Sequence, residues 1–479
     1  MKKFWVVLAV AVAALSAVTA LGVHALRTTH ASPTVYVALG GSDAASGNRS
    51  APYATLQHAV DTVSGGGTVM VRGGTYSQRV VLKAVHHVVI QPAEGEHVVL
   101  DGSSVRVPDG RSAMVEISDS TDVSVRGMDI TGYTTSRIHA VPIGIYVHGS
   151  DERIDIRGNR VHHLGNHNGT LGSMAMNAHG IAVYGDSPTG AVRGLVIDHN
   201  EVDHLTLGAS ETVVVNGNVD HWRITNNRIH DDNNIGIDAI GYEETLPAKS
   251  RYTDLNRARD GYIGSNVVEN ILSKGNPAYY SDGEWCDCAD GIYVDGGTRI
   301  TIDHNTVRHN DIGIEVAAEN ARGAADHVTV AYNLISRSGY TGISTGGYCD
   351  GAQDCGGVQT GRSFDNRFTN NLFQGDNGSS QFLVQYHENR NRITANSFCM
   401  TGAHAHSVDT VARSDSGSKD VVDFNTYSTP DGVTAGTQWG WAGKTYSGWN
   451  PYRHASGLDA HSRFTAKCLA PHGISGNPR

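Results

Sequence analysis

Three short and similar phrases of the sequence each carry a carboxylic acid among alternating apolar residues. They read GIDAI at 236–240, GIYVD at 291–295 and GIEVA at 313–317, and their acids are Asp238, Asp295 and Glu315. Paired carboxylic acids hydrolyse glycosidic bonds, one as the proton donor and the other as the nucleophile or the base. The three acids are therefore the candidate catalytic residues, provided that the fold brings them together.

The phrases belong to an internal repeat. GIYVH, GIAVY and GISTG recur at 144–148, 180–184 and 342–346, and a second kind of phrase has an asparagine between two short apolar stretches. Alternate residues in each phrase are apolar, which is typical of a strand with one buried face. A repeat of about 22 to 40 residues predicts a parallel β-solenoid, in which stacked coils bury a continuous core. The asparagines are expected to bond to one another between coils: Asn159, Asn200, Asn227, Asn266, Asn305, Asn333, Asn371 and Asn396.

The two ends of the repeat carry signs of caps. Residues 53–63 have the apolar spacing of a short amphipathic helix, which would close the first coil. After about residue 400 the repeat fades, and the tail contains Trp439, Trp441, Tyr446, Trp449 and Tyr452. We interpret these aromatics as buried in a C-terminal cap, with a sugar-stacking platform as the alternative.

The N-terminal stretch YVALGGSDAASGNRSAPYATLQHAV, followed by GGTVMVRGGTY, resembles the start of many bacterial carbohydrate-active β-helix proteins. With the repeat, it identifies the chain as similar to the pectin-lyase-like superfamily. The resemblance implies a single-stranded right-handed parallel β-helix, an all-β fold, but not one activity. The superfamily holds polysaccharide lyases, glycoside hydrolases, epimerases and non-catalytic adhesins. The opening also resembles that of β-helical β-xylosidases, whose catalytic Asp and Glu lie on neighbouring coils, although their extra domain is not evident here.

Aligning the phrases on their glycines places the acids relative to one another. Asp238 and Glu315 fall in one outward column, two coils apart and roughly 9.6 Å between backbones. Asp295 falls in a second column on the intermediate coil, roughly 8 Å from each. Carboxyls about 5 Å apart suit a retaining glycosidase and those about 6.5–9.5 Å apart an inverting one, so both outcomes stay open.

Long segments interrupt the coils beside these acids, at 241–262, 272–290 and 346–363, with a further one at 162–179. Insertions beside one patch of a regular scaffold usually build a binding cleft. Aromatic and carboxylic side chains there suit sugar recognition. The predicted substrate-binding residues are His179, Tyr242, Glu243, Trp285, Asp290, Tyr293 and Tyr348.

The N-terminus reads as a secretory signal at 1–31, with cleavage after Ala25 or Ala31, followed by the β-helix at 32–400 and a capping segment at 401–479. We expect a secreted protein; an uncleaved membrane anchor is the alternative. Its six cysteines suit disulfides in an exported chain. Cys349 and Cys355 are close enough in sequence to pair, whereas Cys286 and Cys288 are expected to bond elsewhere, or as the alternative to bind zinc.

Charge limits the partners. The net charge is −11 and no long basic run is present, which argues against nucleic acid as a partner. The favoured function is an extracellular, monomeric glycoside hydrolase acting on a polysaccharide or oligosaccharide without a cofactor. The first alternative is a polysaccharide lyase or uronate epimerase, with Ca²⁺ held by Asp238, Asp290 and Asp295. Its base would be Tyr293, Lys249 or Lys274. The second alternative is a non-catalytic binding protein, in which the side chains of Asp238, Asp295 and Glu315 should diverge rather than line one cleft.

Overall fold

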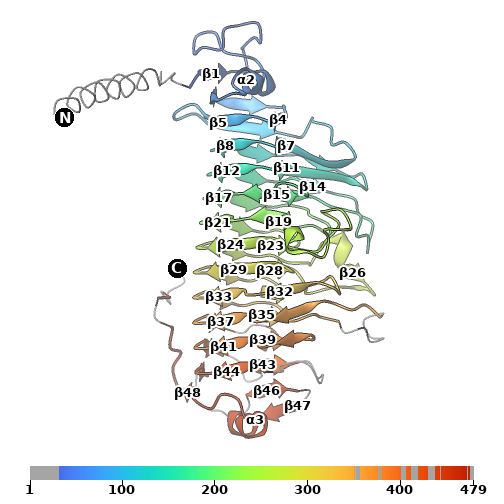
Figure 1. Cartoon of the computed structure of the whole chain (residues 1–479), viewed down its shortest axis with the longest axis vertical. Coiled ribbons are helices and arrows are strands. Elements are labelled where there is room, and N and C mark those ends of the chain that lie inside the picture. Colours follow the sequence, from blue (N-terminus) through green and yellow to red (C-terminus); the bar gives the residue numbers. More distant parts are fainter. Residues whose placement is uncertain are drawn as a thin grey trace, which may run out of the picture. The chain divides into compact units, whose positions relative to one another are not determined.

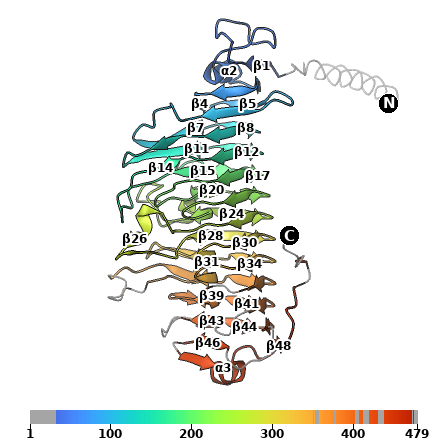
Figure 2. The ribbon, with the colours of Figure 1, turned by 180° about the vertical axis from the view of Figure 1, so that it is seen from behind.

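The computed structural model describes residues 32–349, 351, 357–375, 378, 380–400, 406–410, 419–429, 437–442, 444–471 and 473–474. The predicted signal segment at 1–31 therefore lies outside the described residues. Within the unit from Thr34 to Arg479, strands stack as successive coils, from β1 in blue to β48 in red (Figure 1). Turning the molecule by 180° shows the same stacking from behind (Figure 2).

Three long parallel sheets run along the stack, and each coil contributes in turn to sheet A, sheet C and sheet B. Sheet A contains β1 (Thr34–Val37), β2 (Gly67–Val71), β5 (His86–Pro92), β8 (Thr121–Arg126), β12 (Glu152–Arg157), β16 (Val192–Arg193), β17 (Val196–Asp198), β20 (Val219–Asp220), β21 (Arg223–Thr225), β24 (Arg259–Gly264), β29 (Thr298–Asp303), β32 (Ala324–Asp326), β33 (Thr329–Ala331), β36 (Arg362–Phe364), β37 (Arg367–Thr369), β40 (Glu388–Asn389), β41 (Arg392–Thr394) and β44 (Val421–Asp423).

Sheet B contains β4 (Val80–Lys83), β7 (Gly110–Ser118), β11 (Ala140–His148), β15 (His179–Gly185), β19 (Val213–Gly217), β23 (Ile237–Ile240), β28 (Asp290–Asp295), β31 (Ile312–Ala317), β35 (Thr341–Thr345), β39 (Ser380–Val384), β43 (His406–Thr410), β46 (Gln438–Trp441) and, antiparallel at its end, β47 (Lys444–Ser447).

Sheet C contains β3 (Gly74–Tyr76), β6 (Val98–Asp101), β9 (Asp129–Thr131), β13 (Arg160–His162), β18 (Glu201–Asp203), β22 (Arg228–His230), β25 (Val267–Glu269), β30 (Thr306–Arg308), β34 (Leu334–Ser336), β38 (Leu372–Gln374), β42 (Ser397–Cys399), β45 (Thr426–Ser428) and β48 (Arg463–Thr465). Parallel pairing thus continues past residue 400, where the sequence repeat fades.

The core is a set of ladders of equivalent side chains. Ile237, Ile292 and Ile314 lie opposite one another on neighbouring coils and are fully buried, as are Val294 and Val316 beside them. Each strand therefore turns alternate residues into the core and the intervening residues outward. This arrangement confirms the predicted all-β parallel β-helix and fixes which residues of the repeated phrases face away from its core.

A ladder of buried asparagines joins sheet A to sheet C at every coil from Asn159 to Asn425. At Asn305 the backbone N–H donates to Asn333 Oδ1 at 2.9 Å, and the side-chain amide donates to Ile263 O at 3.0 Å. The residue before it, His304, has a φ of 55°, which turns the chain sharply enough for the amide to point inward. The ladder confirms the structural role predicted for the asparagines.

Each end is covered by a helix. Helix α2 (Leu56–Thr62) is capped at its N-terminus by Thr55, whose side chain accepts a hydrogen bond from His58 N–H, and it buries Leu56, Ala59 and Val60. Helix α3 (Trp449–Ser456) buries Trp449 and Tyr452 close to Trp439, so these three tail aromatics are core residues. A disulfide joins Cys399 to Cys468. No helix among the described residues is both long and apolar enough to cross a membrane.

Candidate active site

Sheet B positions the three predicted catalytic acids. In its register Asp238 of β23 lies opposite Tyr293 of β28, which lies opposite Glu315 of β31, so these residues form one outward column. Asp295 lies two residues beyond Tyr293 and opposite Ala317, in the next outward column. The register is the one predicted from the glycine alignment, because coils of this fold can pair only with their hydrophobic faces aligned.

These three side chains line one cavity of about 870 Å³. Loops between the sheets supply its walls, and the described residues around it are Met174, Asn177, Ala209, Glu211, Ile235, Asp238, Ile240, Glu243, Tyr279, Cys286, Asp287, Cys288, Asp290, Tyr293, Asp295, Ile312, Glu315, Glu319, Tyr340, Tyr348 and Gln385. Four of the predicted substrate-binding residues are among them: Glu243, Asp290, Tyr293 and Tyr348. The acids therefore converge on one cavity rather than scatter over the surface.

The other three predicted substrate-binding residues lie away from this lining. Tyr242 is buried, with the Arg257 guanidinium over its ring. Trp285 packs against Tyr280 in a small hairpin of β26 (Tyr280–Ser281) and β27 (Glu284–Trp285). His179 is buried, with its Nδ1 3.1 Å from Glu211 O, and burial lowers its pKa to about 3. It is neutral at physiological pH, and its Nδ1–H donates to the carbonyl oxygen of Glu211.

One wall of the cavity contains a local disulfide. Cys286 and Cys288 are bonded to each other, so the prediction that each bonds elsewhere, and the zinc alternative, are wrong. The chain bends at Asp287, and the two Cα atoms lie 5.4 Å apart, a separation that a disulfide spans. The short crosslink holds Cys286, Asp287 and Cys288 against the cavity. The predicted Cys349–Cys355 pair includes a residue outside the described part of the chain.

Hydrogen bonds orient the acids. Asp295 Oδ1 accepts the backbone N–H of Glu319 at 2.7 Å, and Glu315 Oε1 accepts the Ser344 hydroxyl at 3.2 Å. Asp290 lies in the same lining, and burial, followed by repulsion from Glu315, raises its pKa well above the usual range. One oxygen of Asp238, its Oδ1, is buried and has no hydrogen-bond partner among the described residues.

Burial and mutual repulsion raise the pKa of the cavity acids. Burial lifts the pKa of Glu315 and of Glu319 to about 7, and that of Glu211 to about 8. The pKa of Asp238 and of Asp295 is raised well above the usual range, first by burial and then by neighbouring carboxylates. Several of the acids therefore hold protons at neutral pH, which is the state that a general acid requires.

Sequence reasoning did not place Glu211, Asp287, Glu319 and Gln385 in the site. Glu319 follows Glu315 by four residues, but it lies beyond the end of β31, where the repeat gives no direction for a side chain. Glu211 precedes β19 at the position that Asp290 occupies two coils later, and this correspondence is the available signal. Gln385 comes from the segment after β39, whose phrase has lost the glycine that identifies the other coils.

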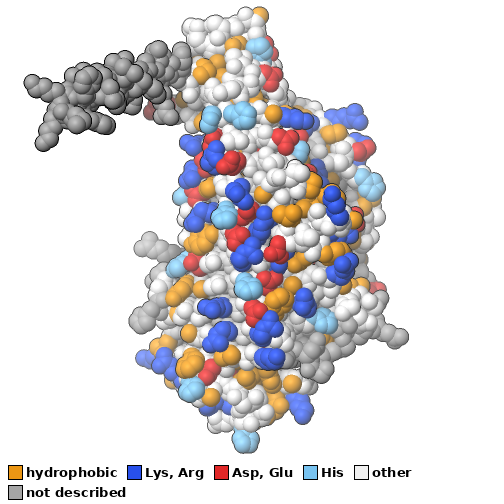
Figure 3. Space-filling view, viewed as in Figure 1, with side chains coloured by type: hydrophobic (Ala, Val, Ile, Leu, Met, Phe, Trp, Pro, Cys, Tyr) orange, Lys and Arg blue, Asp and Glu red, His pale blue; other side chains and the backbone are white. Residues whose placement is uncertain are grey.

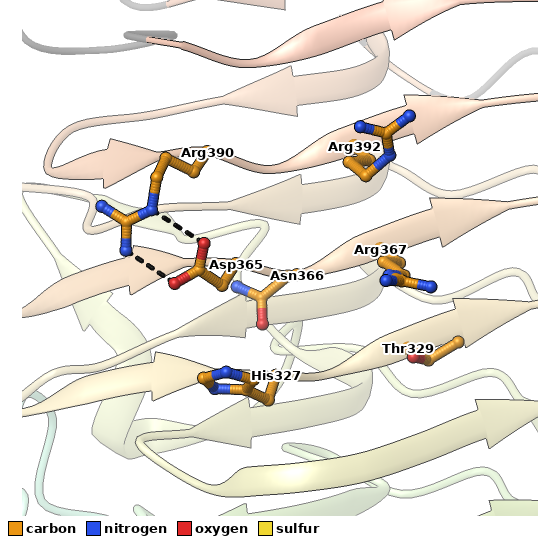
Figure 4. Close-up of a pocket in the computed structure, with 7 residues that line it drawn as sticks. All are labelled: His327, Thr329, Asp365, Asn366, Arg367, Arg390 and Arg392. Carbon is orange, nitrogen blue, oxygen red and sulfur yellow. Dashed lines mark hydrogen bonds and ion pairs between the residues drawn. The ribbon is translucent and has the colours of Figure 1, made fainter.

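The face seen in Figure 3 has charges of both signs. Positive and negative side chains are interspersed over it, and charged side chains pair between coils, as Arg299 does with Asp260 at 2.7 Å. A second cavity of about 550 Å³ lies on sheet A (Figure 4), where Arg390 binds Asp365 and Arg367 lies beside Arg392 on the next coil. It has one carboxyl group among its described lining residues and lacks the paired acids of the sheet B cavity.

Comparison with known proteins agrees with this architecture. The crystal structure of the GH136 lacto-N-biosidase from Eubacterium ramulus superposes with a TM-score of 0.57 at 14% sequence identity, covering 82% of this chain and 67% of the other. The chain is thus a right-handed parallel β-helix protein with an acidic cavity on one sheet. It belongs to the same family as the uncharacterized protein YwoF of Bacillus subtilis (strain 168), to which it is 33% identical over 437 residues, 90% of this chain and 87% of YwoF.

A shorter similarity links the chain to a named enzyme. Over 136 residues it is 29% identical to the pectate lyase PEL9 of Emericella nidulans, which corresponds to 26% of this chain and 33% of PEL9. No protein-family model matches the sequence.

Proposed function

We propose that the protein is an extracellular glycoside hydrolase that cleaves a polysaccharide or oligosaccharide in the sheet B cavity. The observation that carries the proposal is the convergence of Asp238, Asp295 and Glu315 on one cavity from three successive coils. Glycoside hydrolysis requires a protonated carboxyl beside the leaving oxygen and an ionised one near the anomeric carbon. The cavity supplies several carboxyls from which this pair can be drawn.

Glu315 is the proposed acid. Its pKa of about 7, raised by burial, keeps a substantial fraction protonated near neutral pH, where a general acid works most efficiently. The Ser344 hydroxyl donates to Glu315 Oε1 and fixes the direction of its carboxyl. Asp238, which is in the same column, is the alternative acid.

Asp295 is the proposed nucleophile, or the base that activates water. The N–H of Glu319 donates to its Oδ1 and stabilises the ionised form, in opposition to burial and the neighbouring carboxylates, which raise its pKa. Asp295 is on the coil between those of Asp238 and Glu315, in the adjacent outward column, and lines the same cavity. Whether it forms a covalent intermediate decides between retention and inversion.

The remaining lining suits a sugar. Tyr279, Tyr293, Tyr340 and Tyr348 surround the acids, and aromatic rings provide the flat apolar faces on which sugar rings stack. The shared fold with a lacto-N-biosidase supports an enzyme that acts on glycosidic bonds, although likeness of fold does not assign an activity.

The alternative is a Ca²⁺-dependent polysaccharide lyase or uronate epimerase, which the local similarity to a pectate lyase favours. Asp238, Asp290 and Asp295 would hold the cation. Such chemistry needs a base, and no Lys, Arg or His is among the described residues that line the cavity. Tyr293 would have to serve, but burial and the surrounding carboxylates raise its pKa well above its usual value. The hydrolase is therefore the better-supported function.

Product analysis tests the proposal. The wild-type protein is incubated with a panel of uncharged, amino-sugar and uronic polysaccharides, and the products are assayed for new reducing ends and for ultraviolet absorbance. We expect reducing ends without absorbance, unaffected by a chelator. Unsaturated products, or loss of activity with the chelator, would identify the lyase. A panel on which neither signal exceeds that of Glu315→Gln would contradict an enzymatic role.

A further inference from the structure

The cavity has an unbalanced charge. Eight of its described lining residues are carboxylic acids: Glu211, Asp238, Glu243, Asp287, Asp290, Asp295, Glu315 and Glu319. No cationic side chain is present among the described residues of the lining. Buried carboxyls normally pair with a cation or with hydrogen-bond donors, because an unpaired one is costly to bury. The ligand is therefore the expected source of positive charge and of donors.

Unsatisfied oxygen atoms inside the cavity support this expectation. Asp238 and Asp290 are only 2% and 3% exposed, yet the Oδ1 of each has no hydrogen-bond partner among the described residues. Gln385 Oε1, also in the lining, has none either. Gln385 Oε1 is an acceptor, and the carboxyl oxygens of Asp238 and Asp290 accept once these groups are ionised. Buried acceptors without partners are rare in folded proteins, and they point to a ligand that donates hydrogen bonds.

The carboxyls are too dispersed to enclose a bare metal ion. Among the described residues, three groups of His, Asp or Glu have ligand atoms within 4.8 Å of one another: His162 with His163 and Asp203, Glu201 with Asp203 and His230, and Asp220 with His221 and Asp260. None of these groups belongs to the cavity. A Ca²⁺ ion requires six to eight oxygens at about 2.3–2.6 Å. A cavity of about 870 Å³ suits an organic cation instead.

Glu211, Glu243 and Glu319 provide the negative site apart from the three catalytic acids. Burial raises the pKa of Glu211 and of Glu319, and repulsion from Glu243 raises both further. On the side away from the cavity, the charge of Arg111 lowers the pKa of Glu211, and the buried His179 lies 3.5 Å from Glu211 Oε2. Asn216 Nδ2 donates to Glu243 Oε2 at 2.8 Å and fixes that carboxylate at the cavity. An ammonium group placed here would bring a positive charge and N–H donors to these carboxyls.

On the basis of the proposed function, we infer that the substrate is a glycan containing an amino sugar with a free, unacetylated amino group, bound as an ammonium ion by Glu211, Glu243 and Glu319. The ammonium neutralises repulsion among these carboxyls and lets them ionise. Binding near neutral pH therefore releases protons to the solvent. An N-acetylated sugar has neither the charge nor this effect.

Titration calorimetry tests the inference on the Glu315→Gln protein, which is chosen to prevent turnover. The probes are glucosamine, galactosamine and a β-1,4-linked glucosamine tetrasaccharide, each compared with its N-acetylated counterpart at about pH 6–7, where the amines are largely protonated. We expect at least about tenfold tighter binding of one amino sugar, roughly the effect of one added charge contact. The measured heat of amino-sugar binding should depend on the ionisation enthalpy of the buffer, because the buffer takes up the released protons.

Matched variants locate the site. Adding Glu243→Gln or Glu319→Gln should each weaken amino-sugar binding about tenfold and leave binding of the acetylated counterpart unchanged. Glu244→Gln is the control, because the Glu244 side chain is 85% exposed, pairs with Arg251 and does not line the cavity. Circular dichroism checks that each variant is folded.

Equal affinity for every amino sugar and its acetylated form would overturn the inference, as would an amino-sugar affinity insensitive to Glu243→Gln and Glu319→Gln. Ca²⁺ binding that depends on Glu243, without amino-sugar binding, would also overturn it in favour of a metal site. The proposed function fails separately. Amino-sugar binding without hydrolysis by the wild type would contradict the hydrolase and leave the inference standing. Hydrolysis by the wild type without any preference for free amines would contradict the amino-sugar inference and leave the proposed hydrolase function standing.

Discussion

Asp238 and Glu315 occupy the same outward column of sheet B, two coils apart, with Tyr293 between them. Both carboxyls are almost completely buried, at 2% and 6% exposure, although their column faces away from the core. The loops that follow neighbouring strands cover them and form a cavity over an otherwise open sheet. Burial of this kind raises the pKa of both acids. The loops therefore set the protonation of Asp238 and Glu315, and the stacked coils set the distance between them.

Replacing Glu315 by glutamine should reduce kcat by about 10²–10⁴-fold with little change in KM, because glutamine keeps the shape but cannot transfer a proton. Wild-type activity should also fall as pH rises through about 7, where Glu315 loses its proton. Steady-state kinetics on the substrate found by the panel, at several pH values, measure both effects. Glu152→Gln, an exposed change on β12, should have wild-type activity. An unchanged kcat in Glu315→Gln would remove this residue as the acid.

Stability should decrease with rising pH, and Asp238 should contribute to the decrease. Its folded-state pKa is raised well above 3.8, so the folded protein binds more protons than the unfolded chain once the pH exceeds that value. The contribution of Asp238 to the free energy of unfolding is therefore fully present below pH 3.8 and declines as the pH rises toward the folded-state pKa of Asp238. Asp238→Asn removes the ionising group. Its melting temperature should rise relative to the wild type between about pH 5 and pH 8.

Asp122→Asn is the control for this experiment. Arg153 holds the pKa of Asp122 below its usual value, so its titration has the opposite sign and ends below about pH 4. Its difference from the wild type should stay constant from about pH 5 to pH 8. If the melting temperatures of the wild type and Asp238→Asn change in parallel between about pH 5 and pH 8, Asp238 does not hold a proton in the folded protein.

Asn305→Ala should lower the free energy of unfolding by about 2–4 kcal/mol, because it leaves Asn266 N–H and Ile263 O without their buried partners. Urea denaturation followed by circular dichroism gives the value. Thr329→Ala, an outward-facing change on the neighbouring coil, should cost less than about 0.5 kcal/mol. Equal effects of the two substitutions would mean that the asparagine ladder does not stabilise the stack.

The two described disulfides should differ in their contribution to stability. Removing Cys399–Cys468 by serine substitution should cost about 4 kcal/mol, because this bond closes a loop of sequence separation 69. Removing Cys286–Cys288, with a separation of 2, should hardly change the melting temperature but should raise KM, since both residues line the cavity. Thermal denaturation and kinetics on the two double variants separate these effects. A large loss of stability from the shorter crosslink would contradict the assignment.

Much of the fold is predictable from the sequence because its signal is repeated. The alternation in GIDAI, GIYVD and GIEVA identifies strands, and their shared glycines fix the register that puts Asp238, Tyr293 and Glu315 in one column. The asparagine ladder is predictable for the same reason. A parallel stack allows one alignment that buries every apolar ladder, so a local pattern determines a long-range arrangement.

The loops follow no such rule. No local pattern around Cys286 and Cys288 indicates that the chain bends enough to join them. Nor does any pattern show that Glu319 and Gln385 line the cavity while Tyr242 and Trp285 do not. By itself, the sequence determined the β-helix, its register and the three outward acids, because period and spacing specify them. Only the tertiary structure decided which loops cover those acids and what completes the site. Those contacts join residues that are distant in sequence, and side-chain direction in an irregular segment depends on what packs against it.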